Sequence, residues 1–175
     1  KTALVDTVDP PKEGELLLNL DKLGVKNIDY VVSHHGEQDH SGGIPAVLKA
    51  YPNARVVTSP KCKSMLMDLL HVPEERFITV DDGETLSLGD KTLQFIYTPW
   101  VHWPETFVTL GTIRRQNDQV DLDRDVLAMH GVPRRHRQLA VAVPRDVGHI
   151  PPGQEDAGIL LRPAVEVLVL ARRPD

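Results

Sequence analysis

The sequence predicts an α/β sandwich, and two patterns support that prediction. Between residues 3 and 80, short apolar runs typical of strands alternate with segments of helical spacing. Two more strand-like runs follow between residues 85 and 97, bounded by glycine-containing turns. Strands that alternate with helices and then continue as strands indicate an α/β protein with more than one packed layer. A chain of 175 residues with 41% hydrophobic content is long enough to bury one ordinary core.

The individual elements follow from local signals. Recurring leucines predict a helix over residues 13–23, which Gly24 ends. Residues 45–50 open with a proline and residues 61–70 have helical spacing, so both are expected to be helices. Strands are expected at 3–5, 28–32, 54–58, 77–80, 85–88 and 92–97.

The composition changes abruptly near residue 108. All aromatic residues and all lysines lie at or before Phe107, and ten of the arginines lie after it. A folded core normally uses aromatic side chains for bulk. We therefore divide the chain into a domain over residues 1–107 and a divergent tail over 108–175. The tail is read as a frameshifted segment, a partly disordered extension or an unusual folded segment.

Charge, cysteine content and hydropathy exclude several classes of protein. A net charge of −5 without a basic stripe in the first 110 residues argues against a nucleic-acid partner. No apolar run approaches the roughly 20 residues of a membrane helix. The single cysteine, Cys62, cannot form a disulfide framework, and the first residues do not resemble a signal peptide. These features predict a cytoplasmic location, and Cys62 is expected to be a buried helix residue.

Ligand-type side chains gather directly after the strand predicted at 28–32, in the stretch HHGEQDHSGG. Together these side chains indicate a metal site, although any one of them alone is usually an inert surface residue. An extended loop would point residues 35, 37 and 39 to one side, and a turn would bring the next imidazole round. The candidate ligands are His35, Glu37, Asp39 and His40. His34 is either a hydrogen-bonding neighbour or without special role, and the more distant His71 is expected only to end a helix.

Residues 35–42, HGEQDHSG, resemble the metal-binding signature of the metallo-β-lactamase fold in the form used by flavodiiron proteins, the A-type flavoproteins. The resemblance extends to four further stretches and covers residues 1 to about 107. It implies a metallo-β-lactamase-like αββα sandwich, incomplete here because the pattern diverges after about residue 108. The four stretches are TALVDTV at 2–8, IDYVV at 28–32, DDGETLSLG at 81–89 and TPWVHWPET at 98–106.

The resemblance also implies a ligand set for two iron ions. His35, Glu37 and His102 would bind one iron, and Asp39 and His40 the other. Family members add a bridging aspartate and a final histidine, for which Asp125 and His130 are the candidates and His136 and His149 weaker ones.

The choice between iron and zinc depends on Glu37. Zinc hydrolases of this fold generally have histidine there. A carboxylate is a harder ligand that favours iron. Iron is therefore the expected metal and zinc the alternative.

As a family, flavodiiron proteins reduce dioxygen to water or nitric oxide to nitrous oxide. Their electrons come from FMN on a flavodoxin-like domain that this sequence does not resemble, so a reduced flavoprotein or rubredoxin is the expected donor. The resemblance also implies a homo-oligomer. Two other readings stay open: a zinc-dependent hydrolase of the same fold, and a non-catalytic fragment with an incomplete metal site.

Overall fold

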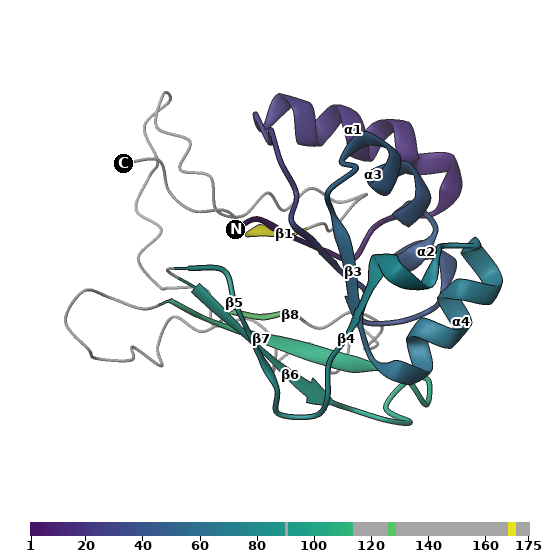
Figure 1. The fold of residues 1–175 in the computed structure, drawn as a ribbon, viewed down its shortest axis with the longest axis vertical. Coiled ribbons are helices and arrows are strands. Elements are labelled where there is room, and N and C mark those ends of the chain that lie inside the picture. Colours follow the sequence, from purple (N-terminus) through teal and green to yellow (C-terminus); the bar gives the residue numbers. More distant parts are fainter. Residues whose placement is uncertain (90, 114–125, 129–167, 171–175) are drawn as a thin grey trace.

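The structure is a computed structural model that describes residues 1–89, 91–113, 126–128 and 168–170. Two β-sheets face each other, and a layer of helices covers the outer face of the first sheet (Figure 1). Within the described residues, no helix covers the outer face of the second sheet. The predicted α/β sandwich of the metallo-β-lactamase type is confirmed, and the described residues form one layer of helices and two sheets.

The first sheet has the strand order β4-β3-β2-β1-β9. Its first four strands along the chain run parallel, and β9 pairs antiparallel with β1. Because the carboxyl ends of parallel strands meet at one edge, the loops that leave them gather there, where α/β proteins commonly bind ligands. The strands are β1 (Ala3–Val5), β2 (Tyr30–Val32), β3 (Arg55–Thr58), β4 (Phe77–Thr79) and β9 (Leu168–Leu170).

The second sheet is antiparallel, with the order β5-β6-β7-β8. Its strands are β5 (Thr85–Ser87), β6 (Lys91–Tyr97), β7 (Phe107–Ile113) and β8 (Val126–Ala128). Strand β7 runs across the predicted boundary between residues 107 and 108. Most of the segment 108–175 lies outside the described residues, so the division into domain and tail stays a prediction.

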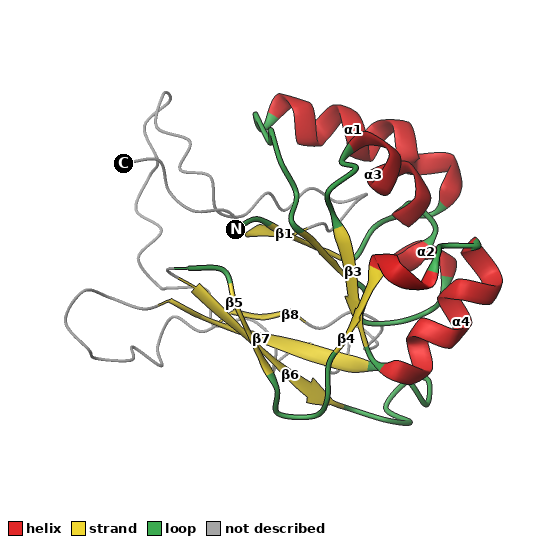
Figure 2. Cartoon of the chain, in the orientation of Figure 1, coloured by secondary structure: helices red, strands yellow, loops and turns green. Residues whose placement is uncertain are grey.

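The helices lie together on one face of the first sheet (Figure 2). Helix α4 has a clear start, because Pro60 occupies its first turn and the Ser59 hydroxyl accepts a hydrogen bond from the backbone N–H of Cys62. It ends at His71, which has a left-handed backbone. The helices are α1 (Glu13–Lys22), α2 (Gln38–Ser41), α3 (Ile44–Ala50) and α4 (Pro60–Leu70), with 3-10 turns at Pro10–Lys12 and Glu74–Arg76.

The parallel strands bury side chains on both faces, which explains their nearly continuous apolar sequences. Leu4, Val31 and Val56 belong to the core beneath the helices. Their chain neighbours Val5 and Val32 belong to the second core, between the two sheets. Phe95 and Phe107 fill that second core with rings whose centroids lie 5.8 Å apart. The first sheet is therefore the central layer, and it is packed on both of its faces.

The predicted strands and helices are confirmed, with ends that shift by up to two residues. The prediction of an extended loop beyond Glu37 was wrong, because residues Gln38–Ser41 form the short helix α2. Cys62 is buried in α4 as expected, and burial raises the pKa of its thiol to about 12. In the described part of the chain, no helix has the length and apolar character to cross a membrane.

Candidate metal centre

The polar loop begins where β2 ends, and hydrogen bonds from side chains hold its backbone. The Thr58 hydroxyl donates to the carbonyl of Ser33 at 2.8 Å, and the Ser33 hydroxyl donates to the carbonyl of His35 at 3.0 Å. The Ser41 hydroxyl donates to the carbonyl of Gly36 at 3.0 Å. These buried hydrogen bonds join protein groups only, so they fix the course of the loop without a bound ion.

His35 is fully buried and lies between two carboxylates. Its Nδ1 is 2.8 Å from Oε1 of Glu105, and its Nε2 is 3.0 Å from Oε2 of Glu37. The rings of His102 and Trp103 pack against it edge to face, with centroids 4.8 and 5.0 Å away. The imidazole is therefore held in one orientation, with Nε2 directed at Glu37.

His102 comes from the loop of residues 98–106 between β6 and β7. This loop closes on itself, because the backbone N–H of Thr98 donates to the carbonyl of Thr106, and that of Trp103 to the Thr106 hydroxyl. Trp100 has a positive φ of 65° and lies 77% exposed beside Lys61, whose amine is 5.8 Å from the indole centroid. The loop thus holds His102 at the mouth of the site, where one third of its side chain is exposed.

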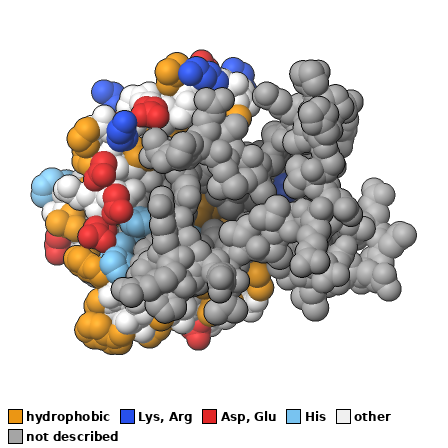
Figure 3. Space-filling model, turned by 180° about the vertical axis from the view of Figure 1, so that it is seen from behind, with side chains coloured by type: hydrophobic (Ala, Val, Ile, Leu, Met, Phe, Trp, Pro, Cys, Tyr) orange, Lys and Arg blue, Asp and Glu red, His pale blue; other side chains and the backbone are white. Residues whose placement is uncertain are grey.

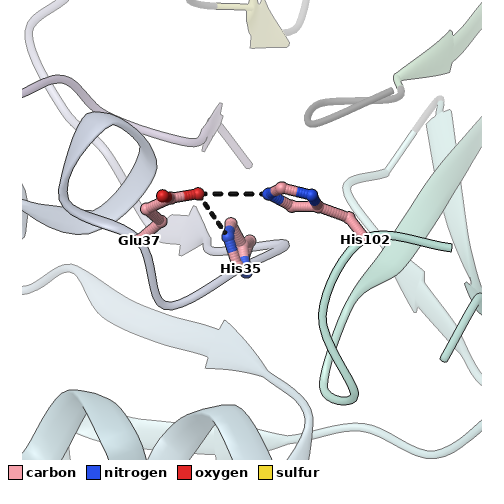
Figure 4. A group of neighbouring side chains, drawn as sticks. All are labelled: His35, Glu37 and His102. Carbon is pink, nitrogen blue, oxygen red and sulfur yellow. Dashed lines mark hydrogen bonds and ion pairs between the residues drawn. The ribbon is translucent and has the colours of Figure 1, made fainter. Parts of the chain in front are cut away.

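Ligand atoms of His35, Glu37 and His102 lie within 4.8 Å of one another (Figure 4). We call this group of three side chains the first position. The same oxygen of Glu37 is 3.0 Å from Nε2 of His35 and 3.1 Å from Nε2 of His102. Hydrogen bonds from these two rings, first from His35, hold the pKa of Glu37 below its usual range.

The contacts of His35 at the first position need one more positive group than a neutral ring supplies. A neutral imidazole carries one N–H, yet both ring nitrogens of His35 face carboxylate oxygens. One of the two contacts would otherwise bring two lone pairs together, so a second proton or a metal ion must lie there. Two imidazoles and a carboxylate are ligands that suit zinc and iron alike. The residues at the first position therefore fit a divalent ion.

Asp6, directly after β1, holds two further histidines. Its Oδ1 accepts from the backbone N–H of His34, and its Oδ2 lies 3.1 Å from Nδ1 of His34 and 3.3 Å from Nδ1 of His40. Asp6 reaches them from a left-handed backbone, with φ of 55°, that aspartate tolerates better than most residues. His34 also contacts Thr109 of β7, at 2.6 Å, so it links the two sheets.

Asp39 and His40, which we call the second position, lie on α2. Their side chains are 3.5 Å apart, and the ring of His40 is 5.5 Å from that of His35. Burial disfavours the charged imidazole of His40, but the hydrogen bond and charge of Asp6 outweigh it and raise its pKa. Asp39 is more than half exposed. The further candidate ligands Asp125 and His130, with His136 and His149, lie outside the described residues.

The turn into α2 corrects the geometry expected from an alternating loop. His35 and Glu37 do meet, but Asp39 and His40 are brought round by a helical turn in which the N–H of Ser41 donates to the carbonyl of Glu37. Gly42 follows in close packing, since a Cβ there would lie 2.5 Å from Cδ of Pro10 and 2.6 Å from the carbonyl of Gln38. Only glycine fits at this point.

Sequence reasoning assigned no site role to Asp6 or Glu105. Both are almost completely buried, and each carboxylate contacts a histidine of the loop. A signal existed in each case, because Asp6 directly follows a buried parallel strand and Glu105 lies three residues after His102. The surface seen from behind shows histidine side chains beside acidic and hydrophobic ones at the margin of the described part (Figure 3).

Two facing sheets with a loop of histidines and carboxylates at the edge of the parallel strands define a metallo-β-lactamase-like protein. A family profile described as "ODP family beta lactamase" matches residues 2–116, more than half of the chain. The chain therefore belongs to this family. The predicted resemblance to flavodiiron proteins is confirmed by its relatives.

Three comparisons illustrate this relationship. The anaerobic nitric oxide reductase flavorubredoxin of Pectobacterium atrosepticum is 35% identical over 132 residues, 74% of this chain and 25% of its own length. The flavodiiron protein of Giardia intestinalis has a TM-score of 0.57 and 32% identity over 62% of this chain and 27% of its own. The rubredoxin oxygen:oxidoreductase of Desulfovibrio gigas has a TM-score of 0.57 and 35% identity over 61% and 27%. This chain spans about a quarter of each.

Proposed function

We propose that this chain is the metal-binding part of a diiron oxidoreductase that reduces nitric oxide or dioxygen. The observation that carries the proposal is the first position, where the ligand atoms of His35, Glu37 and His102 lie within 4.8 Å of one another. The family membership and the names of the relatives, a nitric oxide reductase and an oxygen:oxidoreductase, support the reaction class.

His35, Glu37 and His102 would hold the first iron, and Asp39 and His40 the second, with Asp125 and His130 as candidates for the remaining ligands. Bound iron would supply the electron transfer to a diatomic substrate, while the protein supplies position and charge. Glu37 would offset part of the positive charge of the metal. The hard carboxylate of Glu37 favours iron over zinc at this place.

The surrounding residues orient the ligands and limit the access of water. Glu105 holds His35 from behind, and Trp103 covers one side of its ring. Glu37 and His102 are partly exposed, so the open side of the centre lies between the polar loop and the loop of residues 98–106. A small substrate would approach from that side.

The electrons would come from FMN on a flavodoxin-like domain, from a reduced flavoprotein or from rubredoxin. The names flavorubredoxin and rubredoxin oxygen:oxidoreductase, borne by relatives, support donors of this kind. Assembly into a homo-oligomer, a cytoplasmic location and the lack of nucleic-acid and membrane partners stay predictions of the sequence.

The test is anaerobic reconstitution with ferrous iron, a count of iron per polypeptide, and then consumption of nitric oxide or dioxygen with a reduced flavoprotein as donor. Two irons and consumption of either gas are expected. The Glu37→His variant serves as a comparison, because it creates the ligand type of the zinc hydrolases. Iron bound without consumption of either gas would contradict the proposed reaction. Turnover of nitrocefin or a thioester that rises with zinc would favour the hydrolase, and binding of no metal the non-catalytic fragment.

A further inference from the structure

Glu105 carries a fully buried carboxylate of which only one oxygen is hydrogen-bonded. Oε1 lies 2.8 Å from Nδ1 of His35 and accepts a second, longer bond of 3.3 Å from the backbone N–H of Gly36. Oε2 has no hydrogen-bond partner among the described residues. A buried polar atom without a partner is costly, so its presence requires an explanation.

The geometry at His35 limits the proton arrangement of the ring. Oε1 of Glu105 is an acceptor, so the nitrogen that faces it, Nδ1, must be the donor. In the neutral ring, Nε2 then carries the lone pair in place of the hydrogen that would bond to Glu37, and it is one of the ligand atoms of the first position. This is the arrangement that a metal ligand needs.

We propose that Glu105 is a positioning residue that keeps the proton of His35 on Nδ1 and, through its negative charge, strengthens metal binding at Nε2. The inference rests on the proposed function only in requiring a divalent ion at the first position, whatever reaction follows. It does not depend on the second position or on the electron donor.

The charge of Glu105 is the feature that a hydrogen bond alone does not explain. A glutamine of the same shape would accept the same bond from His35 and would bury no charge. A buried carboxylate is favourable only when a positive charge lies close to it. Among the described residues, no lysine or arginine forms an ion pair with Glu105. A metal ion beyond His35 would provide that charge, carried through the polarised imidazole.

The decisive variant is Glu105→Gln, with Glu75→Gln on the exposed turn after α4 as the matched control. The probes are zinc and cobalt ions added to the metal-free chain, with dissociation constants from competition with a chelator. We expect Glu105→Gln to weaken binding by about 10- to 100-fold. The metal-free variant should resist urea at least as well as the wild type, because it no longer buries an unpaired oxygen of a charged group.

Two results would overturn the proposal. Unchanged affinity in Glu105→Gln would show that the charge is not needed. A loss of affinity in step with a loss of stability in the metal-free chain would reduce Glu105 to an ordinary packing residue.

The position of the proton gives a second readout that needs no metal. Nitrogen chemical shifts of the His35 ring, measured in the metal-free wild type at alkaline pH, should report hydrogen on Nδ1, and Glu105→Ala should weaken that preference. Hydrogen on Nε2 in the wild type would refute the inference. A wild type that binds no ion would contradict the proposed function and the charge effect, and the ring measurement would still decide the orienting role.

Discussion

The two positions of the candidate centre are built in different ways. The first position draws its side chains from two separate loops, one after β2 and one between β6 and β7, and its ligand atoms converge within 4.8 Å. The second position draws Asp39 and His40 from one helical turn, with Asp6 behind His40. The first position forms only when the two sheets have packed together, because its ligands come from loops attached to both. The second position depends mainly on the local geometry of α2. The first position should therefore bind metal more tightly than the second.

Removal of a ligand at the first position should have the largest effect. His102→Ala leaves Glu37 and His35 without their partner from the other loop, and we expect binding to weaken by more than the about 100-fold that loss of an outer partner can cost. Isothermal titration calorimetry with zinc measures the dissociation constant of each variant. His71→Asn is the control, because His71 is exposed and asparagine tolerates its left-handed backbone. Equal affinity in both variants would remove His102 from the ligand set.

A methyl group at Gly42 should disturb the second position through the backbone. Its Cβ would lie 2.5 Å from Cδ of Pro10, so Gly42→Ala should lower the free energy of unfolding by about 1–3 kcal/mol. Gly14→Ala is the matched control, since its Cβ meets nothing within 4 Å, and in α1 it should stabilise by about 0.5 kcal/mol. Urea unfolding of both variants measures the difference. Similar values for the two would contradict the close packing after α2.

Loss of Asp39 should have a moderate effect that is confined to the second ion. Asp39 is 56% exposed and its charge is screened by water. We expect Asp39→Asn to weaken the second equivalent of metal by about tenfold, or ~1.4 kcal/mol, and to leave the first unchanged. Stepwise titration with cobalt separates the two equivalents. An equal loss in both steps would mean that the positions are not independent.

The smallest effect is expected far from the centre, at Asp29. Burial opposes its ionisation, but hydrogen bonds from Lys1 and the backbone N–H of Thr2 outweigh burial and hold the pKa of Asp29 below its usual range. A lowered pKa adds stability above the unfolded value of about 3.9, which is lost as pH falls through the folded value. Asp29→Asn should therefore melt slightly lower than the wild type at neutral pH, and the gap should close below about pH 4. If the difference in melting temperature between the two proteins grew as the pH fell, the pKa of Asp29 would be raised in the folded state and not lowered.

The sequence predicted most of the fold because local signals and burial agree along the first sheet. Val31 and Val56 lie beneath the helices as core residues of apolar runs, and the α4 cap at Ser59 and Pro60 is readable directly. The motif also brought His35 and Glu37 together by spacing alone. In contrast, residues 39–41 are weaker helix formers, and their helical turn is supported from a distant part of the chain, where the backbone N–H of Thr7 donates to the carbonyl of His40.

The sequence places the two carboxylates that orient the histidines near the site, but it does not show which histidine each of them contacts. Glu105 lies 70 residues from His35 in the chain, and only the closed loop of residues 98–106 brings it behind the ring. Asp6 reaches His34 and His40 because its own backbone adopts a positive φ, which no sequence pattern specified. Residues that support a site are chosen by the tertiary structure, while its direct ligands can share one short motif.

The origin of the first position in two sheets has a thermodynamic consequence. An ion held by His35, Glu37 and His102 would link the loop after β2 to the loop between β6 and β7, and the unfolded chain has no such preformed set. By mass action, binding at a free concentration 100 times the dissociation constant would add about 2.7 kcal/mol to the free energy of unfolding. The melting temperature of this domain would then report metal availability, rising with supply and falling when a chelator is added.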